Sequence, residues 1–96
     1  MNYELVVTPS AKRDIAEARY YYAQFGKADH FLAVVEDAFE LISQRPLMFP
    51  VAYEHVRRAL VRRFPFSIFF VVDDHRAVVL AVHHRRRDPA KRPSSP

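Results

Sequence analysis

Hydrophobic and polar positions change their period several times along this chain of 96 residues. Residues 3–8 alternate weakly and are rich in β-branched side chains, which predicts a first strand. From position 11 to position 25 apolar residues recur every three or four positions among charged ones, which is typical of an amphipathic helix. Thr8 or Ser10 can cap the start of this helix, and Gly26, the only glycine, is a typical stop.

The same helical period returns over residues 28–44, where apolar positions form one face and acidic residues occupy the other. Because only one or two residues separate the two predicted helices, we expect them to form a hairpin. Pro46 follows Arg45 and ends the second helix, since proline cannot continue the hydrogen-bond ladder. The stretch 46–50 is interpreted as a stiff, partly buried loop.

Three strand-like runs follow, over residues 56–63, 66–72 and 77–83. The second run is apolar nearly throughout, as a central strand is, and the polar turn 73–76 predicts that the second and third runs pair as a hairpin. The expected fold is therefore α+β with the order β-α-α-β-β-β. In this fold a helical hairpin packs on one face of a small, mainly antiparallel sheet.

Length and composition agree with a single domain over residues 1–88, followed by a disordered tail over residues 89–96 that is rich in proline and serine. The absence of cysteine excludes disulfides, thiolate metal sites and a cysteine nucleophile. The start of the chain lacks the pattern of a secretory signal, and no apolar run is long enough to span a bilayer. We therefore expect a cytoplasmic protein that does not bind a membrane.

Charge is distributed unevenly between the two parts of the chain. Residues 1–54 carry five basic and eight acidic side chains, a balance of −3, whereas residues 55–96 carry ten and three, a balance of +7. Arginine outnumbers lysine by twelve to three, and a guanidinium group matches the geometry of phosphate and carboxylate. This polarisation predicts an anionic partner. The alternatives are a merely solvated surface, or arginines paired internally with Glu54, Asp73, Asp74 and Asp88.

The basic residues of the second part occur on the first C-terminal strand and directly after the last one. They are Arg57, Arg58, Arg62, Arg63, His83, His84, Arg85, Arg86 and Arg87. If the two strands lie near each other in one sheet, these side chains meet at a shared edge. Such an edge could cleave a phosphodiester, with a cation stabilising the phosphate while a histidine moves protons. It could also simply bind phosphates or a carboxylate-rich protein surface.

Other chemistries find little support in the sequence. His83 and His84 are neighbours on a strand and point to opposite faces, so we expect no metal site. No hydroxyl residue lies in a nucleophile motif, and one glycine cannot build a phosphate-binding loop, so no cofactor is expected. The run Tyr20, Tyr21 and Tyr22 cannot form one stacking platform on a helix, and we interpret all three as packing residues.

Several groups of residues occur along the chain in the order typical of one bacterial protein family. They are Ala11, Asp14, Ile15, Ala18, Tyr21 and Tyr22; Phe31, Glu36 and Ile42; Pro46, Phe49 and Pro50; Arg57, Arg58, Leu60, Phe64, Pro65, Phe66, Ile68 and Phe70; and Val79, Leu80, Ala81, Val82, His83, Arg86, Arg87, Asp88 and Pro89. In this order the chain resembles the RelE/ParE superfamily of toxins from type II toxin–antitoxin systems, often labelled plasmid-stabilisation proteins. The resemblance covers about residues 3–89 and implies the fold expected above.

The resemblance implies two different activities. RelE-like members cleave mRNA in the ribosome with basic residues and usually a C-terminal tyrosine, whereas ParE-like members poison DNA gyrase. This chain has no tyrosine after Tyr53, and its ending Arg86-Arg87-Asp88-Pro89 is similar to the ParE branch. A gyrase inhibitor without catalytic residues is therefore expected. An endoribonuclease that uses Arg62, Arg63, His83 and Arg86 remains an alternative, as does a binding module without toxicity.

The resemblance also implies a protein partner. Antitoxins of this superfamily wrap an acidic, partly disordered segment around the toxin. The nine basic residues named above are therefore expected to contact either the target or the antitoxin. A heterotetramer or a larger complex with the antitoxin is one assembly that the resemblance implies.

Overall fold

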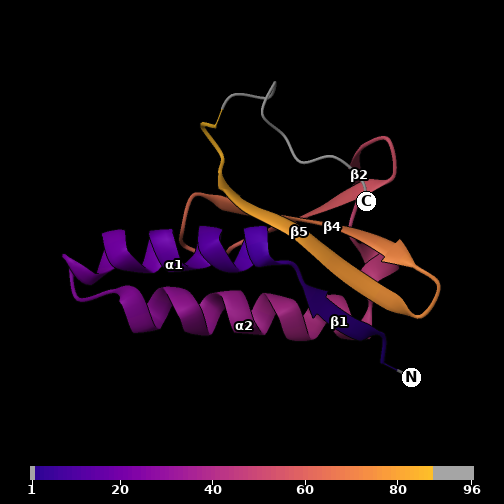
Figure 1. Cartoon of the computed structure of the whole chain (residues 1–96), viewed down its shortest axis with the longest axis horizontal. Coiled ribbons are helices and arrows are strands. Elements are labelled where there is room, and N and C mark those ends of the chain that lie inside the picture. The colour runs from indigo at the N-terminus through magenta and orange to yellow at the C-terminus, as the bar shows by residue number, and fades with distance from the viewer. Residues whose placement is uncertain (1, 88–96) are drawn as a thin grey trace.

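The computed structural model describes residues 2–87, and these form two helices and five strands (Figure 1). The elements are β1 (Glu4–Val7), α1 (Pro9–Ala23), α2 (Ala28–Gln44), a short 3-10 helix (Pro46–Met48), β2 (Val51–Tyr53), β3 (Val56–Leu60), β4 (Phe66–Asp73) and β5 (Arg76–His84). The predicted α+β fold is confirmed. The three-residue strand β2 is an addition to the predicted order. The predicted tail over residues 89–96 lies outside the described residues.

The five strands form one sheet in the order β1-β5-β4-β3-β2. β1 pairs with β5 in parallel, and the other three pairings are antiparallel, so the expectation of a mainly antiparallel sheet is confirmed. The two helices lie together as a hairpin along one face of the sheet (Figure 1). β1 pairs with β5 only from Arg76 to Val79, so the rest of β5 has no strand beside it on that side.

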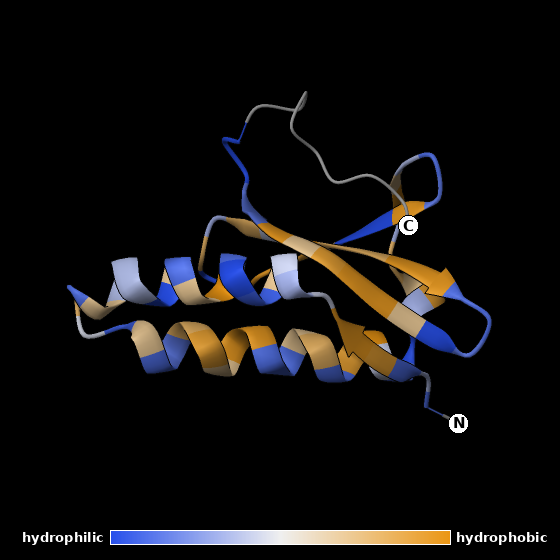
Figure 2. Ribbon diagram, viewed as in Figure 1, coloured by the Kyte–Doolittle hydropathy of each residue, from blue (hydrophilic) through white to orange (hydrophobic). Residues whose placement is uncertain are grey.

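The main core lies between the helical hairpin and the sheet. α2 contributes Phe31, Val35 and Ile42, which are fully buried, and the central strands contribute Ile68 and Val79. In Figure 2, β4 and β5 are apolar along most of their length, whereas each helix shows apolar and polar stripes. Burial on both faces explains why the sequence of β4 shows no alternation.

Thr8 joins the start of α1 to β5. Its hydroxyl accepts a hydrogen bond from the Ala11 N–H at 3.2 Å, as the predicted helix cap does. The same hydroxyl donates to the Leu80 carbonyl at 3.2 Å, and the Thr8 N–H donates to the Val79 carbonyl at 3.1 Å. At the other end α1 stops at Ala23, two residues before the predicted end, and the chain turns through Gly26 at φ 66°.

A β-bulge at Leu80 determines how β5 presents its C-terminal half. Phe69 pairs with Ala81 and Phe70 pairs with Val79, which leaves Leu80 as an extra residue in β5. Val79 and Val82 therefore both pack toward the helices, although they are three residues apart. Beyond the bulge, each side chain points to the face opposite to the one it would take in a regular strand.

The three successive tyrosines of α1 have different environments. Tyr22 stacks on Phe31 with ring centroids 5.3 Å apart and contacts Phe64 edge-on, as expected of a packing residue. Tyr20 and Tyr21 are 80% and 54% exposed, so the prediction that they also pack between the helices is wrong. Tyr21 contacts Tyr22 and Phe25 edge-on and borders a hollow between α1 and the end of β5. Within residues 2–87, no helix is long and apolar enough to cross a membrane.

Candidate functional site

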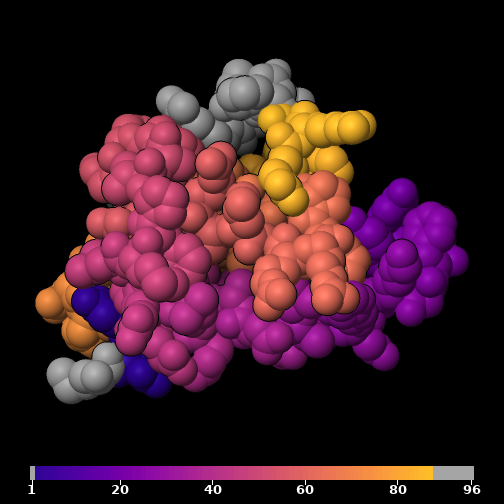
Figure 3. Space-filling view, turned by 180° about the vertical axis from the view of Figure 1, so that it is seen from behind, coloured from indigo at the N-terminus to yellow at the C-terminus, as the bar shows by residue number. Residues whose placement is uncertain are grey.

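Two chain segments meet at one end of the sheet. The turn between β3 and β4, residues 61–65, lies beside the chain that leaves β5. The Arg85 N–H donates to the Pro65 carbonyl at 2.8 Å, and the Arg85 guanidinium donates to the Phe64 carbonyl at 3.2 Å. In the space-filling view of Figure 3 the two segments, salmon and yellow, touch on the surface. The structure thus holds two arginine-rich segments in fixed proximity.

We call the exposed arginines of these segments the arginine rim. The rim consists of Arg62, Arg63, Arg85, Arg86 and Arg87. Among residues 2–87 none of the five forms an ion pair with a carboxylate. Of the carboxylates proposed for internal pairing, the described residues show such a pair at Asp73, which lies 3.2 Å from Arg76 at the opposite end of the sheet. Asp88 lies outside the described residues. The rim is thus a concentration of positive charge in which no arginine forms an ion pair with a described carboxylate, although Asp37 and Asp14 border the hollows beside it.

The arginines in the middle of β3 do not belong to this rim. The Arg57 guanidinium is half-buried and donates to the Phe49 carbonyl at 2.7 Å. Arg58 is exposed and pairs in register with Phe69, on the face of the sheet away from the helices. The predicted meeting of basic residues from two strands therefore occurs at the strand ends and not along β3.

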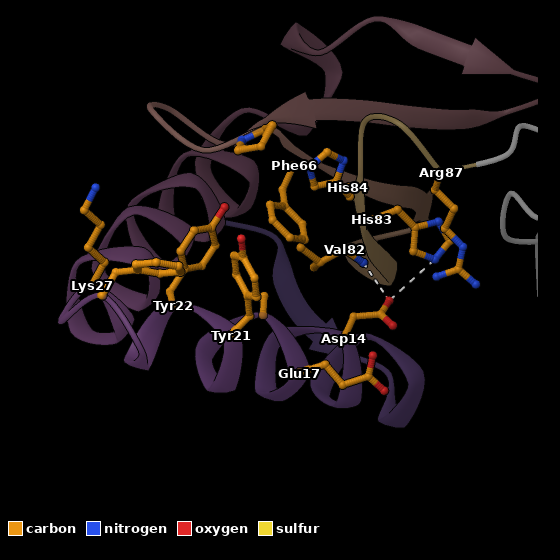
Figure 4. Close-up of a pocket in the computed structure, with 13 residues that line it drawn as sticks. Asp14, Glu17, Tyr21, Tyr22, Lys27, Phe66, Val82, His83, His84 and Arg87 are labelled. Carbon is orange, nitrogen blue, oxygen red and sulfur yellow. Dashed lines mark hydrogen bonds and ion pairs between the residues drawn. The ribbon is translucent and has the colours of Figure 1, made fainter.

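His83 is a buried side chain that connects β5 to α1. Its Nε2 lies 3.6 Å from Asp14 Oδ2, and the same oxygen accepts a hydrogen bond from the Val82 N–H at 2.9 Å (Figure 4). The residue is only 9% exposed, and its ring contacts Phe69. Burial lowers the pKa of His83 below its ordinary value, the nearby Arg87 lowers it further, and Asp14 acts in the opposite direction. His83 is therefore placed as a neutral packing residue.

His84 points to the face of the sheet that the helices cover, whereas the ring of His83 lies against Phe69 on the other face. Its Nδ1 accepts a hydrogen bond from the Arg86 N–H at 3.1 Å, and its ring contacts Phe66 at a centroid distance of 5.3 Å. The two adjacent histidines thus face opposite sides, as predicted, and the bulge at Leu80 decides which of them takes which side. Within the part of the chain that the structure describes, no three metal-ligating side chains gather.

The four residues proposed for a nuclease are only partly brought together. Arg62, Arg63 and Arg86 lie in the rim, but His83 is buried and directs Nε2 to Asp14 on α1. A general base must reach the proton that it removes, either directly or through one water. The arrangement therefore suits charge-based binding better than proton transfer.

Two hollows flank the rim. The first, of about 740 Å³, lies between α1 and the end of β5 (Figure 4). Side chains of both charges and several aromatic rings line it, including Asp14, Glu17, Tyr21, Phe66, His84 and Arg87. Neither Asp14 nor Tyr21 was among the site residues predicted from the sequence. Asp14 meets Val82 across 68 residues, and no local pattern signals such a contact.

The second hollow, of about 410 Å³, lies between α2 and the end of β3, and we call it the α2–β3 groove. Its apolar lining consists of Val34, Ala38, Leu41, Phe49 and Leu60, and the basic residues Arg62 and Arg63 border it. Leu41 and Leu60 are exposed, so the apolar lining of the groove is open to solvent. The groove is thus apolar inside and cationic at one border.

Comparisons with known proteins agree with this architecture. The family model described as ParE toxin of type II toxin-antitoxin system, parDE, matches residues 5–89. A solved chromosomal ParDE toxin–antitoxin system from P. aeruginosa is 20% identical, covers 85% of this chain and 95% of that chain, and superposes with a TM-score of 0.76. The toxin–antitoxin complex RelBE2 from Mycobacterium tuberculosis is 29% identical, covers 88% of this chain and 100% of that chain, and gives a TM-score of 0.61.

The match to the family model, together with the shared fold, assigns this chain to a protein family. A comparison with curated proteins finds no match. The family model extends from β1 to the end of the arginine-rich segment and so includes both flanking hollows and the rim. The resemblance inferred from the sequence is confirmed, and the chain belongs to the ParE toxin family, within the RelE/ParE superfamily of type II toxin–antitoxin systems.

Proposed function

We propose that this toxin inhibits DNA gyrase by binding and that it performs no chemistry of its own. The observation that carries the proposal is the state of the two imidazoles beside the rim. His83 is buried against Asp14, and His84 Nδ1 already accepts a hydrogen bond from the backbone of Arg86. Burial is the main cause that lowers the pKa of His83, and its ring, 9% exposed at the wall of the hollow beside α1, directs Nε2 to Asp14 and not to the rim. The exposed arginines are left as the functional groups of this edge.

An acidic antitoxin is the proposed partner that silences the toxin. The α2–β3 groove supports this proposal, because Leu41, Phe49 and Leu60 offer apolar anchors while Arg62 and Arg63 offer charge to acidic side chains. Co-expression with the reading frame next to its own gene should yield a copurifying complex. The substitution Leu60→Asp should reduce the recovered antitoxin, and an undiminished complex would remove the groove from the interface.

An endoribonuclease is the second candidate function. The observation in its favour is that Arg62, Arg63 and Arg86 lie together without carboxylate partners among the described residues, which would suit a phosphodiester in its transition state. Against it, His83, the imidazole assigned to the role of base, is buried in the described part of the chain.

Two assays in parallel distinguish these functions. Purified protein is titrated into a gyrase supercoiling reaction, and transcript 5′ ends are mapped after the toxin is expressed without its antitoxin. We expect supercoiling to be lost and no new 5′ ends to appear. Full supercoiling at saturating toxin together with new cleavage sites would establish the nuclease. If supercoiling, transcripts and growth are all unaffected, the chain is a binding module without toxicity.

A further inference from the structure

We infer that the arginine rim binds the phosphate backbone of duplex DNA. The inference rests on the proposed function and deepens it, because the toxin would then contact the nucleic acid on which gyrase acts as well as the enzyme. The rim consists of five guanidinium groups from two segments, all of them exposed. None is paired with a carboxylate of the described chain, so their charge is available to a polyanion.

The backbone prepares these groups for binding. Arg85 ties the two segments together through its N–H on Pro65 and its guanidinium on Phe64. Arg63 adopts a left-handed conformation at φ 68°, which a residue with a side chain rarely takes and which belongs to a tight turn. The backbone of the two segments is therefore held in place before a ligand arrives, and less backbone entropy is lost on binding.

The chemistry of the rim favours phosphate over a protein surface. Of the described residues, those in segments 61–65 and 85–87 include no exposed large aliphatic or aromatic side chain. Stable protein interfaces usually need such anchors at their centre, whereas interfaces with DNA are polar and strongly positive. Exposed apolar residues such as Leu41, Leu47 and Met48 lie outside these segments. Leu60 borders the α2–β3 groove together with Arg62 and Arg63, so the apolar surface meets the rim there, whereas the segment 85–87 carries charge alone.

Charge elsewhere on the molecule would orient this edge toward DNA. Acidic side chains gather on the exposed side of α2, at Glu36, Asp37 and Glu40. Asp37 borders the α2–β3 groove together with Arg62 and Arg63, but no ion pair joins it to either. An approaching polyanion is repelled by α2 and attracted by the rim.

The test measures binding of the full-length toxin to a labelled duplex of about 20 base pairs by fluorescence anisotropy, between about 50 and 200 mM salt. A rim that neutralises three to five phosphates predicts a slope of log affinity against log salt of about −3 to −4.5. The variant Arg62→Gln with Arg86→Gln should weaken binding about tenfold and reduce the magnitude of the slope by about 2. Neither side chain forms a hydrogen bond that the fold requires among the described residues.

The matched control is Arg45→Gln with Arg76→Gln, which removes the same charge from exposed positions at the opposite end of the sheet. Equal losses in both variants would mean that net charge and not the rim binds DNA, which would overturn the inference.

Absence of duplex binding while gyrase is still inhibited would also overturn the inference, and would leave the proposed function intact. If the rim variant loses affinity for a gyrase subunit without DNA but not for the duplex, the rim binds an acidic protein surface instead. Binding of duplex without any effect on gyrase would support the inference and refute the proposed function.

Discussion

The contact between Asp14 and His83 determines at the level of single residues what the end of β5 can do. One carboxylate oxygen of Asp14 accepts the Val82 N–H, which has no strand partner at this edge, and lies 3.6 Å from His83 Nε2. A side chain of α1 thereby replaces the missing neighbour strand. His83 is used for packing, and the adjacent His84 is held by the backbone of Arg86. Within residues 2–87, both histidines of this arginine-rich edge are therefore already held by other groups.

The lowered pKa of His83 predicts how stability changes with pH. Its pKa in the folded protein lies below the ordinary value of 6.5, mainly because the ring is buried. The unfolded chain then binds the proton more readily, so this residue makes stability fall as pH drops through about 6.5 toward the folded pKa. Urea unfolding at about pH 7.5 and pH 5 should show a larger loss of stability for wild type than for His83→Gln.

The other histidines are common to both proteins in that comparison, so the difference isolates His83. Asp14, Arg87 and the ring of Phe69 are the groups that face it. Equal losses in the two proteins would mean that His83 is not buried in its neutral form.

At the level of elements, the connection between α1 and β5 depends on Thr8. Its hydroxyl caps α1 through the Ala11 N–H and donates to the Leu80 carbonyl beside the bulge. The cap was predicted as Thr8 or Ser10, because a hydroxyl residue beside proline at a helix start is a local pattern, and the structure selects Thr8. The second bond was not, because the bulge arises from pairing between strands that are distant from Thr8 in sequence.

Removal of this hydroxyl should therefore cost more than an ordinary cap. We expect Thr8→Ala to lower the free energy of unfolding by about 2 kcal/mol, since a cap bond and a strand contact are lost together. Thr8→Ser keeps the hydroxyl and should stay within about 0.5 kcal/mol of wild type. Urea unfolding measures both. Equal destabilisation by the two variants would assign the effect to the lost methyl group and not to the hydrogen bonds.

Local patterns can be predicted from the sequence, whereas pairing between distant strands cannot, and this explains which elements were missed. Helix α2 was predicted with its observed bounds, because seventeen residues of regular apolar spacing are a strong signal. Strand β2 was missed because it has only three residues, and its pairing with β3 is what makes it a strand. The bulge at Leu80 was missed for a similar reason, since the run from Ala77 to Val82 is apolar with or without it.

At the level of the whole molecule, chain topology converts a charge imbalance along the sequence into a cationic edge. Arg62 and Arg86 are distant in sequence, but β4 pairs with both β3 and β5, so the chain after β3 and the chain after β5 lie at the same end of the sheet. The imbalance itself was visible in the sequence. The exclusion of Arg57 from the edge was not, because it depends on the bond to the Phe49 carbonyl.

The most direct test of this account compares charge variants in a gyrase supercoiling assay. Wild type and the control Arg45→Gln with Arg76→Gln should inhibit at the same dose, whereas Arg62→Gln with Arg86→Gln should need at least about tenfold more protein, because two rim contacts are lost. Circular dichroism establishes that all three proteins are folded. Inhibition by the rim variant at the wild-type dose, or no inhibition by wild type, would contradict the claim that this toxin acts through binding by its arginine rim.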